Sequence, residues 1–266
     1  MVMHIRAVTE DYIKDLLVRG TREDGRDPSE FRPINLATGI MPNAEGSAQV
    51  ELGSTKVIAG VKIGVGEPMS DKPDEGNMIT SAELLPVASP NYETGPPSPE
   101  AIELARVIDR GIRAAGMIDT KGLFIEQGKV WEVFTDIYII NYDGNLFDAG
   151  TLAAAAALST ARMPKYEADG DKSNIIREGS LGRLKIANTA TSCTFAKIAN
   201  SVILDPDGNE ESCMDARLTI ANDENVVRAM QKGLSGAFST RELDNLMGIT
   251  FERSKELRKL IENAKA

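Results

Sequence analysis

A strand-like run leads through a short loop into an alanine-rich run, and this order constrains the fold more than any other feature of the chain. Residues 130–141 are rich in β-branched and aromatic side chains, which favour extended backbone. Residues 151–161 are mostly alanine and leucine, which are strong helix formers. The sequence therefore predicts a strand followed by a helix, with residues 143–150 as the connecting loop.

This loop lacks the groups of an anion site. A helix N-terminus after a strand often binds phosphate, because its free backbone N–H groups and its dipole both point at the ligand. Here Leu146 and Phe147 offer no side-chain donors. Asp148, the predicted N-cap, places a carboxylate where a phosphate would need positive charge. The loop therefore indicates a helix terminus that does not bind phosphate.

Composition indicates an ordinary globular protein. The 266 residues, 42% of them hydrophobic, can bury the core of one large domain or two small ones. No apolar run approaches the roughly 20 residues of a membrane span. The N-terminus lacks the apolar stretch of a signal peptide, so we expect a cytoplasmic protein with no membrane partner. The net charge of −10 argues against non-specific coating of nucleic acid but allows a local basic patch.

Few residues suit nucleophilic catalysis or metal binding. His4 is the only histidine, and we expect it in a frayed terminus. The chain therefore cannot assemble a Ser-His-Asp or Cys-His arrangement or a multi-histidine metal site. Cys193 and Cys213 fit neither a disulfide framework nor a CxxC metal pair and are predicted as core or near-surface residues. The commonest hydrolase designs and redox chemistry are thereby excluded.

The first half of the chain predicts helices beside an antiparallel sheet. Apolar residues at helical spacing predict a helix over residues 9–19. Residues 67–99 indicate an irregular surface loop, because an acidic stretch there is followed by five prolines, at residues 86, 90, 96, 97 and 99. Ser98 and Pro99 begin the next helix, which Gly116 ends. Strands are predicted at residues 32–40, 47–52, 56–65, 123–126 and 130–141.

The second half repeats the order of strands followed by a helix. Its strands are predicted at residues 184–186, 193–198, 201–204, 216–220 and 226–231. A capping box between Ser239 and Glu242 begins the last helix. The predicted divisions are an N-terminal helix and loop, a first half, a connector and a second half with the C-terminal helix, at residues 1–30, 31–165, 166–182 and 183–266. The alternation predicts an α/β (α+β) fold with helices covering one face of a mixed sheet.

A basic stripe lies on the helix that begins at Pro99. Arg106, Arg110 and Arg113 stand at positions i, i+4 and i+7, so all three project along one side, opposite the apolar face. Taken alone, such a stripe indicates a solvated helix face.

Five acidic residues near residue 210 invite a cation-site interpretation. They are Asp205, Asp207, Glu210, Glu211 and Asp215. An EF-hand loop counted from Asp205 would need glycine at its sixth position and glutamate at its twelfth, where this chain has Glu210 and Ala216. We therefore expect a solvated hairpin and no metal site.

Several motifs, taken in order and spacing, resemble the RNase PH family of phosphate-dependent 3′→5′ exoribonucleases over nearly the whole chain. They are Asp24-Gly25-Arg26 with Arg32-Pro33, the pair Gly46-Ser47-Ala48 and Ala59-Gly60-Val61, Glu83-Leu84-Leu85-Pro86, and Asp143-Gly144. The proline-rich loop favours the non-catalytic branch, the RNase PH-like subunits of the archaeal exosome. The resemblance implies an RNase PH-like, ribosomal protein S5 domain 2-like fold with two β-sheet halves and packed helices. Taken alone, the segment 24–26 fits a turn with a structural ion pair as well as an interface role.

The resemblance implies a degenerate phosphate loop. Active members follow Asp-Gly with a Gly-Thr-Arg-type segment that holds phosphate. This chain has Asn145, Leu146 and Phe147 there, followed by Asp148. Losing one well-placed donor to developing charge costs roughly 10²–10³ in rate, and this loop loses several.

The resemblance also implies degenerate acid and metal positions. Active members place two aspartates six residues apart to hold a divalent ion and supply acid catalysis. The corresponding positions here are Glu211 and Arg217, and a guanidinium can neither ligate a metal nor readily give up a proton. A shift of two residues would offer Asp215 instead. We expect no catalytic residue, bound metal or cofactor in this chain.

The function implied by the resemblance is that of a non-catalytic structural and RNA-binding subunit. Such a subunit pairs with a catalytic RNase PH-like exosome subunit, helps to shape its active site, and alternates with it in a six-membered ring beneath S1 or KH cap subunits. Single-stranded RNA threads the pore, so Arg106, Arg110 and Arg113 become predicted contacts to its backbone. Two alternatives stay open: an active phosphate-dependent 3′→5′ exoribonuclease with unorthodox residues, and a free-standing RNA-binding protein.

Overall fold

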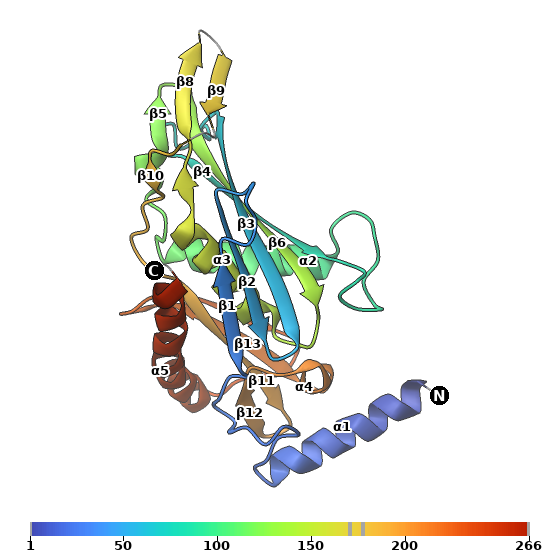
Figure 1. Ribbon diagram of the computed structural model, residues 1–266. Coiled ribbons are helices and arrows are strands. Elements are labelled where there is room, and N and C mark those ends of the chain that lie inside the picture. The colour runs from blue at the N-terminus through green and yellow to red at the C-terminus, as the bar shows by residue number, and fades with distance from the viewer. Residues whose placement is uncertain (1, 170–171, 177–178, 265–266) are drawn as a thin grey trace.

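Two β-sheets organise the chain (Figure 1), of which the computed structural model describes residues 2–169, 172–176 and 179–264. The larger sheet has the order β1-β2-β3-β6-β4, with β5 paired to β6. Only β4 and β6 are parallel neighbours in it. Its strands are β1 Ile34–Thr38, β2 Gly46–Leu52, β3 Thr55–Gly66, β4 Asn77–Leu84, β5 Phe124–Glu126 and β6 Lys129–Asn141. The smaller, antiparallel sheet has the order β12 Ser201–Leu204, β11 Thr191–Ile198, β13 Ala216–Asn222 and β14 Val227–Gly233.

Helix α3, Leu146–Thr160, lies between the two sheets. It contacts β2 and β3 of the larger sheet and β11 of the smaller one. Every residue from Leu146 to Ser159 is buried. The approach is so close that a Cβ at Gly46 of β2 would stand 2.3 Å from the carbonyl oxygen of Ala157. The alanine-rich sequence of α3 therefore supplies the small side chains that a helix packed between two sheets requires.

Two helices begin at the caps predicted from the sequence. In α2, Pro99–Ala114, the Ser98 hydroxyl accepts a hydrogen bond from Ala101 N at 3.2 Å. In α5, Thr240–Ala264, Ser239 N donates to Glu242 and Glu242 N donates to the Ser239 hydroxyl, as in a capping box. Among the described residues, no helix is long and apolar enough to cross a membrane.

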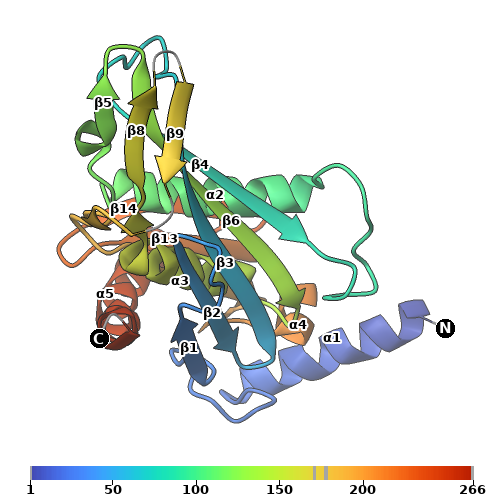
Figure 2. The same ribbon diagram turned by 45° about the horizontal axis from the view of Figure 1, so that its top comes forward.

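The remaining elements lie around the two sheets. Helix α1, Val2–Val18, buries Ile13 and Leu17 against β11, β12 and Cys213, the residue that follows α4. It runs along one edge of the molecule in Figure 2. The other elements are the 3₁₀ helix η1 Thr120–Leu123, α4 Gly208–Ser212, and the short strands β7 Arg162–Met163 and β10 Gly182–Arg183. Strands β8 Lys165–Asp169 and β9 Lys172–Ile176 form a hairpin that projects beyond the larger sheet. The expected connector is thus largely a hairpin, and its residues 170–171 and 177–178 lie outside the described residues.

The α+β class with two sheets and packed helices is confirmed, but residues 67–99 are not wholly irregular. They contain β4, which buries Met78 and Ala82 and pairs in parallel with β6. The five prolines of residues 86–99 all follow β4 in the chain. The partner that stabilises β4 lies more than forty residues away in the sequence, since Asn77 pairs with Glu132 of β6. Local composition therefore did not reveal the strand.

Three further expectations are corrected. Helix α1 begins at Val2, so the backbone of His4 is helical rather than frayed. Residues 184–186 form no strand and contribute only the bridge between Ile118 and Ile186. The acidic segment forms the short helix α4 instead of a hairpin, because Asp207 and Glu210 make a capping box at its start.

Gly144 tests the close packing of the loop before α3. It has a φ of +80°, and a Cβ there would lie 2.4 Å from Asp207 C and 2.5 Å from Pro206 O. Gly128 has a φ of +81°, with nothing within 4 Å of such a Cβ. We expect Gly128→Ala to lower the free energy of unfolding by about 1 kcal/mol, and Gly144→Ala to lower it by about 2 kcal/mol more because backbone must move. Urea unfolding measures both losses, and equal losses would contradict the close packing.

Candidate functional site

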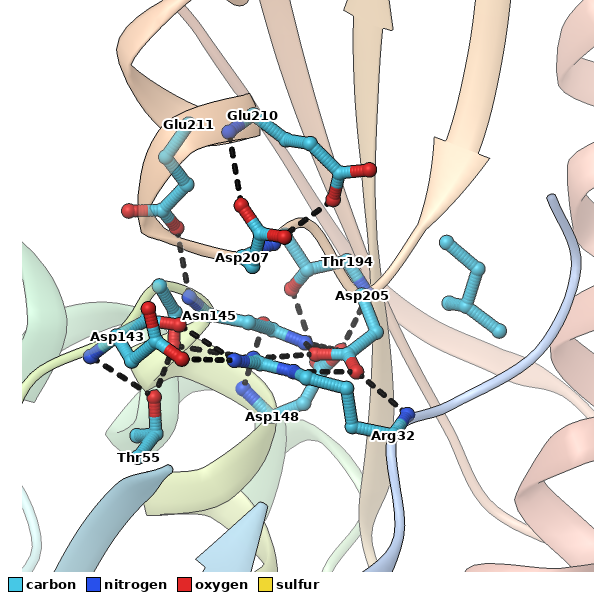
Figure 3. Close-up of polar contacts among 12 residues, drawn as sticks. Arg32, Thr55, Asp143, Asn145, Asp148, Thr194, Asp205, Asp207, Glu210 and Glu211 are labelled. Atoms are coloured by element: carbon cyan, nitrogen blue, oxygen red, sulfur yellow. Dashed lines mark hydrogen bonds and ion pairs between the residues drawn. The ribbon is translucent and has the colours of Figure 1, made fainter. Parts of the chain in front are cut away.

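The candidate site lies where the N-terminus of α3 meets the loop between β12 and α4 (Figure 3). Thr55 of β3 fixes the approach to α3, since its hydroxyl donates to Gly144 O at 2.7 Å and accepts from Asp143 N at 3.1 Å. On the other side, Gly144 packs against Pro206 and Asp207. The predicted phosphate-loop segment is therefore held between the two sheets.

Asn145, and not Asp148, is the N-cap of α3. Its φ of 51° lies in the left-handed region, which asparagine tolerates better than most residues. Its Oδ1 accepts a hydrogen bond from Asp148 N at 3.4 Å. The predicted cap is wrong because α3 begins at Leu146, ahead of the alanine-rich run that marked it in the sequence.

Asp148 turns its carboxylate into the interior, toward β11. It accepts hydrogen bonds from Thr194 N at 2.7 Å, from the Thr194 hydroxyl at 2.9 Å, from the Ser192 hydroxyl at 2.7 Å and from Asn145 Nδ2 at 2.9 Å. Burial raises the pKa of Asp148 to about 6, although these hydrogen bonds oppose the rise. Asp148 therefore joins α3 to the smaller sheet and does not face a ligand at the loop.

Asp205 is fully buried and carries the densest set of polar contacts in the site. It accepts from Arg32 N at 2.8 Å, Arg32 Nε at 3.0 Å, Arg32 Nη2 at 2.9 Å, Arg26 Nη1 at 3.0 Å and Asn145 Nδ2 at 2.7 Å. Burial alone would raise the pKa of Asp205, but the contacts with Arg32 and Asn145 hold it below its ordinary value. Arg26 also pairs with Asp24, so the segment 24–26 forms a structural ion pair.

The acidic segment is not a solvated hairpin. Glu210 is 1% exposed and forms an ion pair with Arg22 at 2.6 Å. Asp215 Oδ2 accepts from Ala199 N at 2.7 Å. The acids therefore serve separate partners, and within the described ranges no group of three or more histidine, cysteine, aspartate or glutamate side chains could hold a metal ion.

The Glu211 carboxylate lies at the N-terminus of α3. Its Oε1 accepts from Asn145 N at 2.8 Å, and its Oε2 accepts from the Tyr142 hydroxyl at 2.6 Å. The Tyr142 ring in turn packs against Tyr92 of the proline-rich loop, with centroids 5.7 Å apart. Burial raises the pKa of Glu211, while these two donors and the charge of Arg217 oppose the rise. A carboxylate of the chain itself thus accepts from the backbone N–H of the residue that caps α3.

Arg217 lies over the first turn of α3. Its guanidinium carbon is 4.1 Å from the centroid of the Phe147 ring, and its Nη2 forms an ion pair with Glu103 of α2. Its Nε is buried and has no hydrogen-bond partner in the described structure. Leu146 and Phe147 are both buried, and their apolar side chains offer no hydrogen-bond donor at the first turn. The structure therefore brings the loop residues together with Glu211 and Arg217 at one helix terminus.

The arginine stripe is exposed along one side of α2. Arg106, Arg110 and Arg113 line a groove of about 420 Å³ beside β4. Arg113 forms an ion pair with Asp109 at 2.9 Å, and Arg110 donates to Gln231 of β14 at 2.8 Å. In the described part of the chain, Arg106 has neither a hydrogen bond nor an ion pair. The stripe thus has one arginine whose charge is fully available to a ligand.

Three contributions to the site were not predicted: the cap role of Asn145, and the contacts of Tyr142 and Arg22. The Gly144-Asn145 pair carried a signal, since both residues tolerate positive φ and asparagine is a strong N-cap. No local signal marks Tyr142 or Arg22, because their partners lie 69 and 188 residues away in the sequence.

Asp148 and Asp205 provide a test of the site's electrostatics, because both bind Asn145 Nδ2 but only Asp205 contacts arginines. We expect Asp148 to titrate at pH about 6 and Asp205 below the ordinary aspartate range. A raised folded pKa means that the stability contributed by Asp148 falls as the pH rises toward about 6. Asp205 has the opposite sign: its contribution is present above the ordinary aspartate pKa and is lost as the pH falls through its lowered folded pKa. Carboxyl ¹³C NMR measures both, and coincident titrations would contradict the assignment.

Comparisons with known proteins agree over both halves of the chain. Models of the 3′ exoribonuclease family match residues 30–164 with domain 1 and residues 188–253 with domain 2. The exosome complex component Rrp42 of Thermococcus gammatolerans is 46% identical over 256 residues, which is 96% of this chain and 94% of that protein. A chain of the solved Archaeoglobus fulgidus exosome with RNA bound to the active site is 38% identical, with a TM-score of 0.87 over 96% of this chain and 98% of that one. An archaeal exosome core gives a TM-score of 0.84 at 36% identity over 97% of this chain and 98% of the matched chain. This chain therefore belongs to the RNase PH family of 3′ exoribonucleases.

Proposed function

We propose that this chain is a non-catalytic structural and RNA-binding subunit of an archaeal exosome. The observation that supports this most directly is the N-terminus of α3, where apolar side chains and the Glu211 carboxylate lie at the predicted phosphate position. Similar proteins are named exosome complex components, and a similar chain belongs to an exosome with RNA bound.

Phosphorolysis at this terminus would lack its phosphate-binding groups. Leu146 and Phe147 stand where hydroxyl and guanidinium donors are expected in active members. An incoming phosphate would also meet the negative charge of Glu211, which already takes the Asn145 N–H. Each lost donor costs roughly 10²–10³ in rate, so the combined loss supports a subunit without catalysis.

The acid and metal positions support the same proposal. Glu211 is engaged by Tyr142 and Asn145, and Arg217 is engaged by Glu103 and Phe147. A guanidinium cannot ligate a divalent cation or act as a general acid at neutral pH. Asp215 remains the alternative for the second position, but it binds the backbone at Ala199.

The catalytic residues would come from a partner subunit. We propose a catalytic RNase PH-like exosome subunit that alternates with this chain in a cytoplasmic hetero-hexameric ring, whose active site this chain helps to shape, beneath S1 or KH cap subunits. Strands β1 and β4 are the edges of the larger sheet, and pairing across an interface would cover such edges. We propose that the chain is divided into an N-terminal helix and loop at residues 1–30, a first RNase PH-like half at 31–165, a connector at 166–182, and a second half with the C-terminal helix at 183–266.

The RNA contribution of this chain would come from α2. Arg106, Arg110 and Arg113 are exposed in one groove, where guanidinium groups can contact successive phosphates of a single strand. Such contacts would hold RNA without reading its sequence. Arg106 is the best candidate, because it has no internal partner to give up among the described residues.

The proposed lack of catalysis is tested with the purified chain. We expect no nucleoside diphosphate when the chain alone is incubated with RNA, inorganic phosphate and Mg²⁺, and release of nucleoside diphosphates once the catalytic partner is added. Release by the chain alone would support the alternative of an active phosphorolytic exoribonuclease. A stable species of 28.7 kDa isolated from the source cells would instead support a free-standing RNA-binding protein.

The arginine stripe is tested with Arg106→Ala/Arg110→Ala in the assembled complex. We expect the complex to retain RNA more weakly. We also expect the plot of log binding constant against log salt concentration to become less steep, by about 0.7 for each RNA phosphate that the variant no longer neutralises. Arg19→Ala/Arg241→Ala removes the same charge from exposed positions elsewhere and should leave binding nearly unchanged. If both double variants behave alike, the stripe is only a solvated helix face.

A further inference from the structure

The three arginines of the stripe on α2 are held differently by the rest of the chain. Arg106 has neither a hydrogen bond nor an ion pair within the described residues, and Arg110 makes one hydrogen bond, from Nη1 to Gln231 Oε1 at 2.8 Å. Arg113 makes two with Asp109, from Nε to Oδ2 at 3.0 Å and from Nη2 to Oδ1 at 2.9 Å. Such charge-assisted, bidentate pairs are stronger than hydrogen bonds between neutral groups. Arg113 therefore already has the kind of partner that an RNA phosphate would offer.

The pair of Asp109 and Arg113 is anchored to β4. Asp109 Oδ1 also accepts a hydrogen bond from the Thr80 hydroxyl at 3.1 Å, and Arg113 Nη2 donates to Met78 O at 3.1 Å. The side chain of Asp109 is 26% exposed, whereas that of Arg113 is 47% exposed. An ion pair between two mobile surface side chains contributes little, but here β4 holds both partners in place. The contact is therefore a fixed feature of the groove.

Asp109 also lowers the positive charge of the groove. It is the only acid among the described residues that line the groove with the three arginines. A phosphate that approaches Arg113 must displace this carboxylate, whereas a phosphate at Arg106 displaces no partner among the described residues. Because the affinity for RNA depends on how many phosphates are neutralised, the pair reduces the affinity that three free arginines would give.

We infer that Asp109 sets how tightly the stripe binds RNA: its carboxylate occupies Arg113 in place of a backbone phosphate, so removing the carboxylate adds a phosphate contact. The inference rests on the proposed function, because it concerns the same RNA surface. RNA that is shortened from one end has to advance past α2, and every phosphate contact must break before the strand moves. An occupied Arg113 therefore keeps the bound strand mobile.

The test measures the affinity of the assembled complex for a single-stranded oligoribonucleotide at several salt concentrations, without inorganic phosphate so that the RNA is not degraded. We expect Asp109→Asn to tighten binding, because it releases Arg113, while the new amide oxygen can still accept from Thr80. The plot of log binding constant against log salt concentration should become steeper, by about 0.7 for each phosphate that Arg113 gains. This slope corresponds to about fivefold tighter binding at about 0.1 M salt for each added contact.

Two further variants separate this effect from a general change of charge. Asp15 and Arg19 form a matched ion pair at the end of α1, with the same spacing of four residues and 3.7 Å between Oδ2 and Nη2. Asp15→Asn makes the same change of charge outside the groove and should bind RNA like the wild type. Asp109→Asn/Arg113→Ala should lose the gain in affinity and in slope, because the released guanidinium is then absent.

An Asp109→Asn complex with the wild-type affinity and slope overturns the inference. A gain that survives in Asp109→Asn/Arg113→Ala also overturns it, because the gain then comes only from lost repulsion. If Asp109→Asn does not assemble, Asp109→Ser, which also keeps an oxygen, is held to the same expectation. The proposed function fails differently: Arg106→Ala/Arg110→Ala then leaves RNA binding unchanged, and the inference falls with it. If only the inference fails, Arg106→Ala/Arg110→Ala still weakens binding.

Discussion

The buried carboxylate of Asp205 is the interaction on which the arrangement of the two sheets depends. It joins the segment before β1, through Arg26 and Arg32, to the cap of α3, through Asn145. A carboxylate without partners in the interior would cost several kcal/mol, so the chain reaches its stable form only when all these segments are in place. The Arg22–Glu210 pair extends the same connection to α4. The positions of Asn145 and Glu211 at the α3 terminus follow from this arrangement.

The fold and the chemistry of the α3 terminus are separable. Packing between the sheets requires small side chains along α3 and a glycine at residue 144, and the sequence keeps both. Nothing in that packing requires donors at residues 146 and 147, which here are leucine and phenylalanine. A member of the RNase PH family can therefore retain the architecture needed for assembly while the phosphate-binding groups are replaced by apolar side chains and an internal carboxylate.

Much of the fold could be predicted because periodicity and caps are local properties. Ser98 and the Ser239–Glu242 box begin α2 and α5 as expected. Strand β4 was missed because its stability comes from parallel pairing with β6, and a neighbouring proline-rich loop hid its alternation. The acidic segment was misjudged for a similar reason: its buried members are compensated by Arg22 and Arg32, which lie near the other end of the chain.

Residue identity and local order are enough to indicate helices α2, α3 and α5, the family, and the loss of donors at residues 146 and 147. The role of each acid follows from the folded chain alone: Asp148 binds β11, Asp205 binds Arg32, and Glu211 binds the N-cap residue of α3. The reason is physical. The free energy of a charge depends on its burial and on the donors around it, and those donors come from segments as far as 188 residues away in the sequence.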